Sequence, residues 1–134
     1  MKNLKLTFLL LIVGVGLTTC TEEQLATTKA GTTKQQCYDL AHQDFVKIMK
    51  NCKTSRGLNV KAYNDAKERR DKKLKECDTL PGPGVDEKTK CKYDLEDRLY
   101  SSIAINKDLF SGKELEDRLK FIESYYQEEI QKCE

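Results

Sequence analysis

The sequence predicts an all-α fold, a four-helix up-down bundle made of two αα-hairpins that are each stapled by a disulfide bond. Three observations support this prediction. Apolar residues recur at helical spacing in four separate stretches, cysteines lie symmetrically about two chain reversals, and only two of the 134 residues are proline. A hydrophobic fraction of 38% with a charged fraction of 34% is typical of amphipathic helices with solvated outer faces.

An export signal is expected at residues 1–20. A short basic start with Lys2 and Lys5 precedes a run at 6–17 that is apolar apart from one threonine and two glycines. Such a run matches the apolar region of a secretory signal. It is too short for a membrane-spanning helix, which needs about 20 apolar residues. We therefore expect a secreted, extracellular protein with no membrane contact after signal cleavage.

The position of the cleavage site decides the fate of Cys20. The residues at 18–20 suit a eukaryotic signal peptidase, which would either discard or retain this cysteine. In the alternative interpretation, Leu17-Thr18-Thr19-Cys20 resembles a lipobox, and Cys20 is the lipidated first residue of a bacterial lipoprotein. Thr19 then occupies a position where Gly, Ala or Ser is usual. The number of cysteines in so small a chain favours eukaryotic secretion.

Residues 21–35 are rich in Thr, Gln and Lys and show no apolar period, so we expect a flexible tether there. A helical domain is expected over residues 36–134, with one apolar stripe on each of four helices. The stripes are Cys37, Ala41, Phe45, Ile48 and Cys52; Val60, Tyr63, Ala66, Arg70, Leu74 and Cys77; Cys91, Leu95, Leu99, Ile103, Asn106 and Phe110; and Leu115, Leu119, Ile122, Tyr126, Ile130 and Cys133.

Capping residues predict where the first two helices begin. Thr33 and Gln36 have the spacing of a capping box before the first stripe. A turn containing Gly57 follows that stripe, and Asn59 is a suitable N-cap for the second helix.

Breaks in the helical pattern predict how the two hairpins are joined and closed. Residues 80–84 alternate Pro and Gly, which cannot continue a helix, so this segment should link the hairpins. Gly112 permits the second reversal, and Ser111 with Glu114 has the spacing of a capping box for the fourth helix.

The cysteine positions predict which thiols meet. Cys37 and Cys77 lie about 19 and 21 residues from the first turn, and Cys91 and Cys133 lie about 20 and 21 residues from the second. Because residues equidistant from the turn face each other in an antiparallel pair, we expect the bridges Cys37–Cys77 and Cys91–Cys133. Because all four thiols are expected at one end of the bundle, the alternative disulfide pairing Cys37–Cys91 with Cys77–Cys133 is also possible.

Cys52 lies at the opposite end, near the first turn, without an obvious partner. Three roles are open for it: an unpaired buried thiol, an intermolecular link, or the mate of a retained Cys20. The tether is long enough for the last pairing, at roughly 3.4 Å per extended residue.

The residues argue against catalysis and metal binding. Zinc ligands usually come in close pairs, whereas the nearest two cysteines are fourteen positions apart and His42 is the single histidine. We expect His42 on the helix surface, facing away from Cys37 and unable to activate its thiol. The sequence has neither a glycine-rich phosphate loop nor a nucleophile elbow. We therefore predict no enzyme, no catalytic residue, no metal and no cofactor.

Charge is balanced overall but unevenly distributed. The formal charge of +2 comes from Lys2 and Lys5 in the leader, which leaves 22 basic and 22 acidic residues from position 21 onward. A neutral chain has no global field to attract nucleic acid, so we expect no nucleic-acid partner. Residues 61–75 hold seven basic against three acidic residues, and residues 94–134 hold eleven acidic against six basic. We expect one helix face to complement the other.

With catalysis and nucleic-acid binding disfavoured, the sequence favours a protein that binds another protein or a small ligand. Six tyrosines stand in a chain without Trp, and those off the apolar stripes either line an interface or pocket mouth or cap a thin core. We expect a non-catalytic interaction protein of unknown partner. The alternative is an extracellular carrier of a small apolar ligand, which needs a cavity that four short helices leave little room for.

One family resemblance points to the same class. The start Cys37-Tyr38-Asp39-Leu40, the widely spaced cysteines through helical sequence, and the segment 123–133 ending on Cys133 are similar to the tsetse EP-type domain of insect secreted and gut proteins. As a pattern, the likeness spans most of residues 35–134. It implies an extracellular protein of gut, saliva or seminal fluid, and it implies no catalytic residues.

Overall fold

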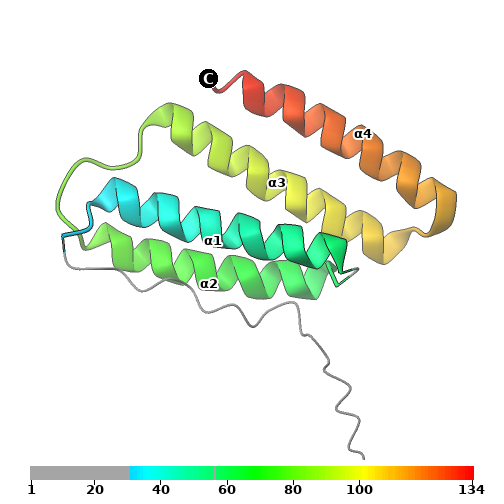
Figure 1. Ribbon diagram of the computed structural model, residues 1–134, viewed down its shortest axis with the longest axis horizontal. Coiled ribbons are helices and arrows are strands. Elements are labelled where there is room, and N and C mark those ends of the chain that lie inside the picture. Colours follow the sequence, from blue (N-terminus) through cyan, green and yellow to red (C-terminus); the bar gives the residue numbers. More distant parts are fainter. Residues whose placement is uncertain (1–30, 56) are drawn as a thin grey trace, which may run out of the picture.

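The computed structural model describes residues 31–55 and 57–134, and these form four helices (Figure 1). They are α1 (Lys34–Thr54), α2 (Val60–Asp78), α3 (Glu87–Leu109) and α4 (Gly112–Gln131). The predicted fold class is confirmed: an all-α, four-helix bundle of two disulfide-stapled hairpins. The expected signal at residues 1–20, with Cys20, lies outside the described residues.

The first two helices begin at the caps that the sequence indicates. Thr33 is the N-cap of α1, and its side chain and that of Gln36 form a complete capping box. The helix therefore starts at Lys34, two residues before the expected domain boundary at 36. Asn59 caps α2 by accepting a hydrogen bond of 2.8 Å from the backbone N–H of Ala62.

The second half of the chain differs from expectation at its caps. Asp86, for which no capping role was expected, caps α3 by accepting a hydrogen bond of 3.0 Å from the backbone N–H of Thr89. Ser111 is the N-cap residue of α4 but makes no side-chain cap hydrogen bond, so the predicted capping box there is wrong. Gly112 has a φ of 60°, a left-handed conformation that glycine adopts freely, and it makes the tight reversal possible.

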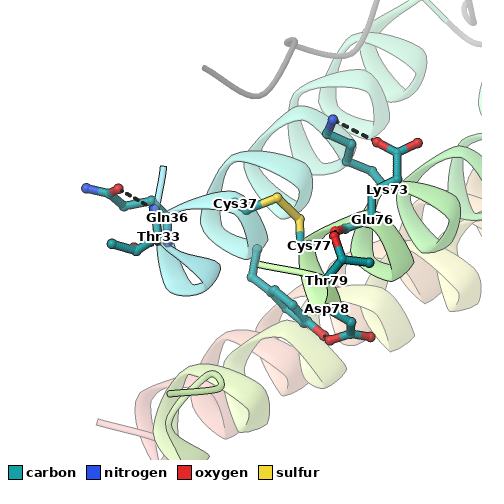
Figure 2. The surroundings of a disulfide bond; sticks show 9 residues. Thr33, Gln36, Cys37, Lys73, Glu76, Cys77, Asp78 and Thr79 are labelled. Atoms are coloured by element: carbon teal, nitrogen blue, oxygen red, sulfur yellow. Dashed lines mark hydrogen bonds and ion pairs between the residues drawn. A yellow bond between two sulfur atoms is a disulfide. The ribbon is translucent and has the colours of Figure 1, made fainter. Parts of the chain in front are cut away.

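Each hairpin is closed at its open end by the disulfide expected there. Figure 2 shows the Cys37–Cys77 bridge joining the start of α1 to the end of α2, where the two Cα atoms are 5.6 Å apart. The Cys91–Cys133 bridge joins the start of α3 to the residues after α4, with a Cα–Cα distance of 5.8 Å. The alternative pairing across the hairpins is therefore wrong.

Cys52 corrects a second expectation. It is fully buried and disulfide-bonded, so the hypothesis of an unpaired thiol is wrong. The other four described cysteines are held in the two hairpin bridges, so the partner of Cys52 lies outside the described residues.

The apolar core lies between the first hairpin and the middle of α3. Its fully buried members include Phe45 and Met49 of α1, Leu58 of the first turn and Ile103 of α3. Cys91, expected on a core-facing stripe, is exposed, because α3 leaves this core at its first turns.

Helix α4 forms the outer layer of the bundle. Figure 1 shows α3 between α1 and α4, and α4 packs along α3 without contacting α2. Leu119 and Ile122 reach the edge of the core, yet no residue of α4 is buried. The helix thus covers one side of α3 and leaves its own far side open. None of the described helices is long and apolar enough to cross a membrane.

Candidate binding surfaces of the helical bundle

A carboxylate of α3 joins the two hairpins. Asp97 accepts hydrogen bonds from Lys67 Nζ at 2.8 Å, from Arg70 Nη1 at 3.0 Å and from the Tyr63 hydroxyl at 3.0 Å. Burial by itself raises the pKa of Asp97, but the hydrogen bond from Lys67 and the charges of Arg70 and Lys67 hold it below its usual value. The carboxylate is therefore a structural link between α2 and α3.

Arg70 is the buried cation of this link. It is 7% exposed, and its guanidinium stacks on the Phe45 ring while also contacting Asp71. The sequence placed Arg70 near the middle of the second apolar stripe without assigning it a role. Its stem and planar head fill core space, and its donors are satisfied by carboxylates at the rim.

His42 is buried, which corrects the expectation of a surface residue. It is 3% exposed, its Nε2 lies 2.5 Å from Glu96 Oε2, and its ring is stacked on Tyr93 with 3.8 Å between centroids. One feature of the sequence indicated this burial: His42 precedes Phe45 by three positions and so lies at the edge of the first apolar stripe. In the structure, α3 covers that edge.

Tyr93 is held at its other end by α1. Its hydroxyl donates to Asp39 Oδ1, and Tyr93 thereby joins α1 to α3 next to the His42–Glu96 pair. Burial, followed by the hydrogen bond to Asp39, raises the pKa of Tyr93 well above its usual value. The result is a fixed polar and aromatic layer between the two helices.

A cleft lies on this layer. It has a volume of about 410 Å³ and is lined by α1 and α3 through His42, Gln43, Val46, Lys47, Lys50, Asn51, Lys92, Tyr93 and Glu96. Its rim is basic, because three lysines surround it and its single carboxylate already contacts His42.

A second groove lies where side chains of α2, α3 and α4 come together. Its volume is about 340 Å³, and it is lined mainly by polar and charged groups: Tyr63, Lys67, Asp94, Asp97, Arg98, Ser101, Ser102 and Tyr126. Lys67 and Asp97 are paired with each other, as are Arg98 and Asp94. Most of the charge in this groove is therefore neutralised within the chain.

The far side of α4 carries exposed aromatic rings. Phe121 is 72% exposed and Tyr125 is 48% exposed, and their rings are stacked with 6.4 Å between centroids. A shallow hollow of about 540 Å³ adjoins Phe121. We call this surface the α4 outer face, formed by Lys113, Glu114, Asp117, Arg118, Phe121 and Tyr125.

The charge complementarity expected between helices is found only in part. Lys67 and Arg70 of the basic segment pair with Asp97, but α2 and α4 are not in contact. Among residues 31–55 and 57–134 no ion pair joins α2 to α4, and Glu123 of α4 pairs with Lys53 of α1 at 2.6 Å.

Comparisons of the chain with known proteins identified no related protein. No protein-family model, curated protein sequence or solved structure matches the chain. Within residues 31–55 and 57–134, no three His, Cys, Asp or Glu side chains are grouped so that they could hold a metal ion.

Proposed function

We propose that this chain is a secreted, non-catalytic interaction protein that binds a protein partner through the α4 outer face. The observation that supports this most directly is the exposure of Phe121, stacked on Tyr125, on a helix with no buried residue. Stacked aromatic rings in solvent are costly to hydrate and are enriched at protein interfaces.

The charges around these rings indicate the chemistry of the partner. Helix α4 contains six acidic and three basic residues. Asp117 precedes Phe121 by one helical turn, Glu128 follows Tyr125 by one, and both carboxylates are exposed. A partner with an apolar centre and a basic rim would bury the rings and pair with these carboxylates.

The rest of the molecule suits such a role in an oxidising compartment. Two hairpin disulfides hold the open ends of the bundle, which keeps α3 and α4 in a fixed relation for binding. The signal expected from the sequence at residues 1–20 and the resemblance to EP-type secreted proteins favour the same location.

The alternative of a carrier for a small apolar ligand has less support. The groove that α3 forms with α2 is lined mostly by charged and polar side chains, and the cleft between α1 and α3 is surrounded by three lysines that a wholly apolar ligand could not pair with. An apolar ligand would strip water from these groups without replacing their hydrogen bonds. The lipoprotein alternative concerns Cys20, which lies outside the described residues.

Site-specific photo-crosslinking tests the proposal. Benzoylphenylalanine would replace Phe121 in the oxidised mature protein, and a matched sample would carry it in place of Lys72, an exposed residue of α2. Both would be incubated with the fluid into which the protein is secreted. We expect an adduct from position 121 that excess wild-type protein suppresses and that excess F121A/Y125A protein does not.

Two results would count against the proposal. Equal adducts from positions 121 and 72, or suppression by the F121A/Y125A protein as strong as by the wild type, would show that the α4 outer face is not the binding surface. An adduct of twice the chain mass would identify a second copy as the partner, in place of the heterologous protein proposed.

A further inference from the structure

The α1–α3 cleft gathers positive charge in one place. Lys47 and Lys50 lie about one helical turn apart on α1, and Lys92 faces them from α3. Within the described part of the chain, Lys50 and Lys92 have no ion-pair partner. Ammonium groups held around a concave surface repel one another, and an anion placed between them relieves that repulsion.

The floor of the cleft is apolar, aromatic and held in place. Val46 and the stacked rings of His42 and Tyr93 form it. Glu96 fixes the imidazole from one side, and Asp39 accepts a hydrogen bond from the Tyr93 hydroxyl on the other. A floor that is already ordered loses little conformational entropy when a ligand lies on it.

We propose that this cleft binds a small amphiphilic organic anion, with its carboxylate, sulfate or phosphate head among Lys47, Lys50 and Lys92 and its apolar body on Val46 and Tyr93. The side-chain amides of Gln43 and Asn51 line the same cleft and supply hydrogen-bond donors for the head. A volume of about 410 Å³ is within the range of small-ligand sites. This site lies on α1 and α3 and does not depend on the α4 outer face.

The test uses the oxidised mature protein, labelled with ¹⁵N, and 1-anilinonaphthalene-8-sulfonate as the probe. This probe combines one anionic group with an apolar aromatic body. We expect saturable shifts of backbone amide signals at 43–51 and 92–96. We also expect the K50E/K92E variant to bind the probe about tenfold or more weakly, because two attractive charges become repulsive.

A matched variant separates this cleft from the α4 outer face. K113E/K120E makes the same charge change on α4, next to Phe121, and we expect it to leave the affinity unchanged. All substituted lysines are exposed, so the variants should keep the wild-type circular dichroism spectrum. If K50E/K92E unfolds, the neutral K50Q/K92Q variant replaces it, with a smaller expected loss of affinity.

Two further probes distinguish the sources of the anion. Dodecanoate represents a lipid-derived ligand, and inorganic sulfate represents the anionic head alone. We expect dodecanoate to compete with the aromatic probe and sulfate to compete only weakly. Equal competition by sulfate would overturn the amphiphilic part of the proposal. Signal shifts confined to residues 113–125, or unchanged affinity in K50E/K92E, would overturn the site itself.

Discussion

The guanidinium carbon of Arg70 lies 4.4 Å from the centroid of the Phe45 ring, so a cation of α2 packs on a fully buried ring of α1. The same guanidinium reaches Asp97 of α3 at 3.0 Å. One side chain therefore connects three helices, because its planar head stacks on the ring while its N–H groups remain free to donate.

Replacing Arg70 by alanine should destabilise the protein by about 3 kcal/mol, the lower end of the cost of breaking a mostly buried ion pair. The loss includes packing on Phe45 and leaves Asp97 with fewer donors. Urea unfolding of the oxidised protein, followed by circular dichroism, measures it. Lys72→Ala on the exposed side of α2 is the control, expected within about 0.5 kcal/mol of wild type. Equal effects of the two substitutions would contradict the role of Arg70.

Asp97 should make stability fall in acid. Its native pKa is lowered by Lys67 and Arg70. At a pH near the unfolded pKa of about 3.9, the unfolded chain therefore binds more protons at this carboxylate than the native protein does. The stabilisation is present above that pKa and is lost as the pH falls through the lower native pKa. We expect Asp97→Asn to be less stable near neutral pH and to lose less on acidification. Parallel stability curves for the two proteins in urea titrations between about pH 6 and about pH 3 would refute this.

Tyr38 and Tyr100 should ionise at higher pH than an ordinary tyrosine, as should Tyr93, whose pKa is also raised. The hydrogen bond to Asp78 raises the pKa of Tyr38 to about 12, and burial raises the pKa of Tyr100 to about 12. Their contribution to stability is present below the unfolded pKa of about 10 and is lost as the pH rises through about 12.

Ultraviolet absorbance titration of the native and the denatured protein measures this difference. Tyr38→Phe should remove one late-ionising group from the native curve and leave the denatured curve otherwise unshifted. Coincident ionisation of Tyr38 and Tyr100 in the native and the denatured protein would contradict the expectation.

Cys52 should be linked to Cys20 in the secreted protein. Cys52 is disulfide-bonded, and Cys20 is the one other cysteine outside the two hairpin bridges. Proteolysis without reduction, followed by mass spectrometry, should release a peptide containing both residues, which requires signal cleavage before Cys20. A lipid on Cys20 would contradict this pairing and favour the lipoprotein, and a cross-linked dimer through Cys52 would favour the intermolecular link.

Truncation to alanine should cost much stability at Phe45 and almost none at Phe121. Phe45 is fully buried, so Phe45→Ala should cost about 3 to 5 kcal/mol of stability through lost burial and a cavity. Phe121 is 72% exposed, and Phe121→Ala should change stability by less than about 0.5 kcal/mol. Chemical denaturation of both variants measures the contrast. A large loss for Phe121→Ala would mean that this ring serves folding, which would weaken the proposed role of the α4 outer face.

The residues that meet across helices could not be read from spacing alone. His42 lies at the edge of the first stripe, and it is buried because α3 covers that edge with Tyr93 and Glu96. Asp97 has the same kind of neighbours in the sequence as Asp94, yet Asp97 faces Arg70 whereas Asp94 is exposed. Asp94 and Asp97 are three positions apart, so their side chains point about 60 degrees apart around the helix axis, and the direction of the neighbouring helix decides which of them is covered.

By itself, the sequence determined the four helices and their turns, and it favoured the two hairpin bridges, whereas the structure excluded the pairing across the hairpins. These features depend on periodicity, on glycine and proline, and on equal distances from a turn, all of which are local or nearly local. Only the tertiary structure decided that α4 lies on the outside, that His42 and Arg70 are buried, and that three lysines surround one cleft. These outcomes depend on how one hairpin rests on the other, and that docking is set by the summed packing of many side chains far apart in the chain.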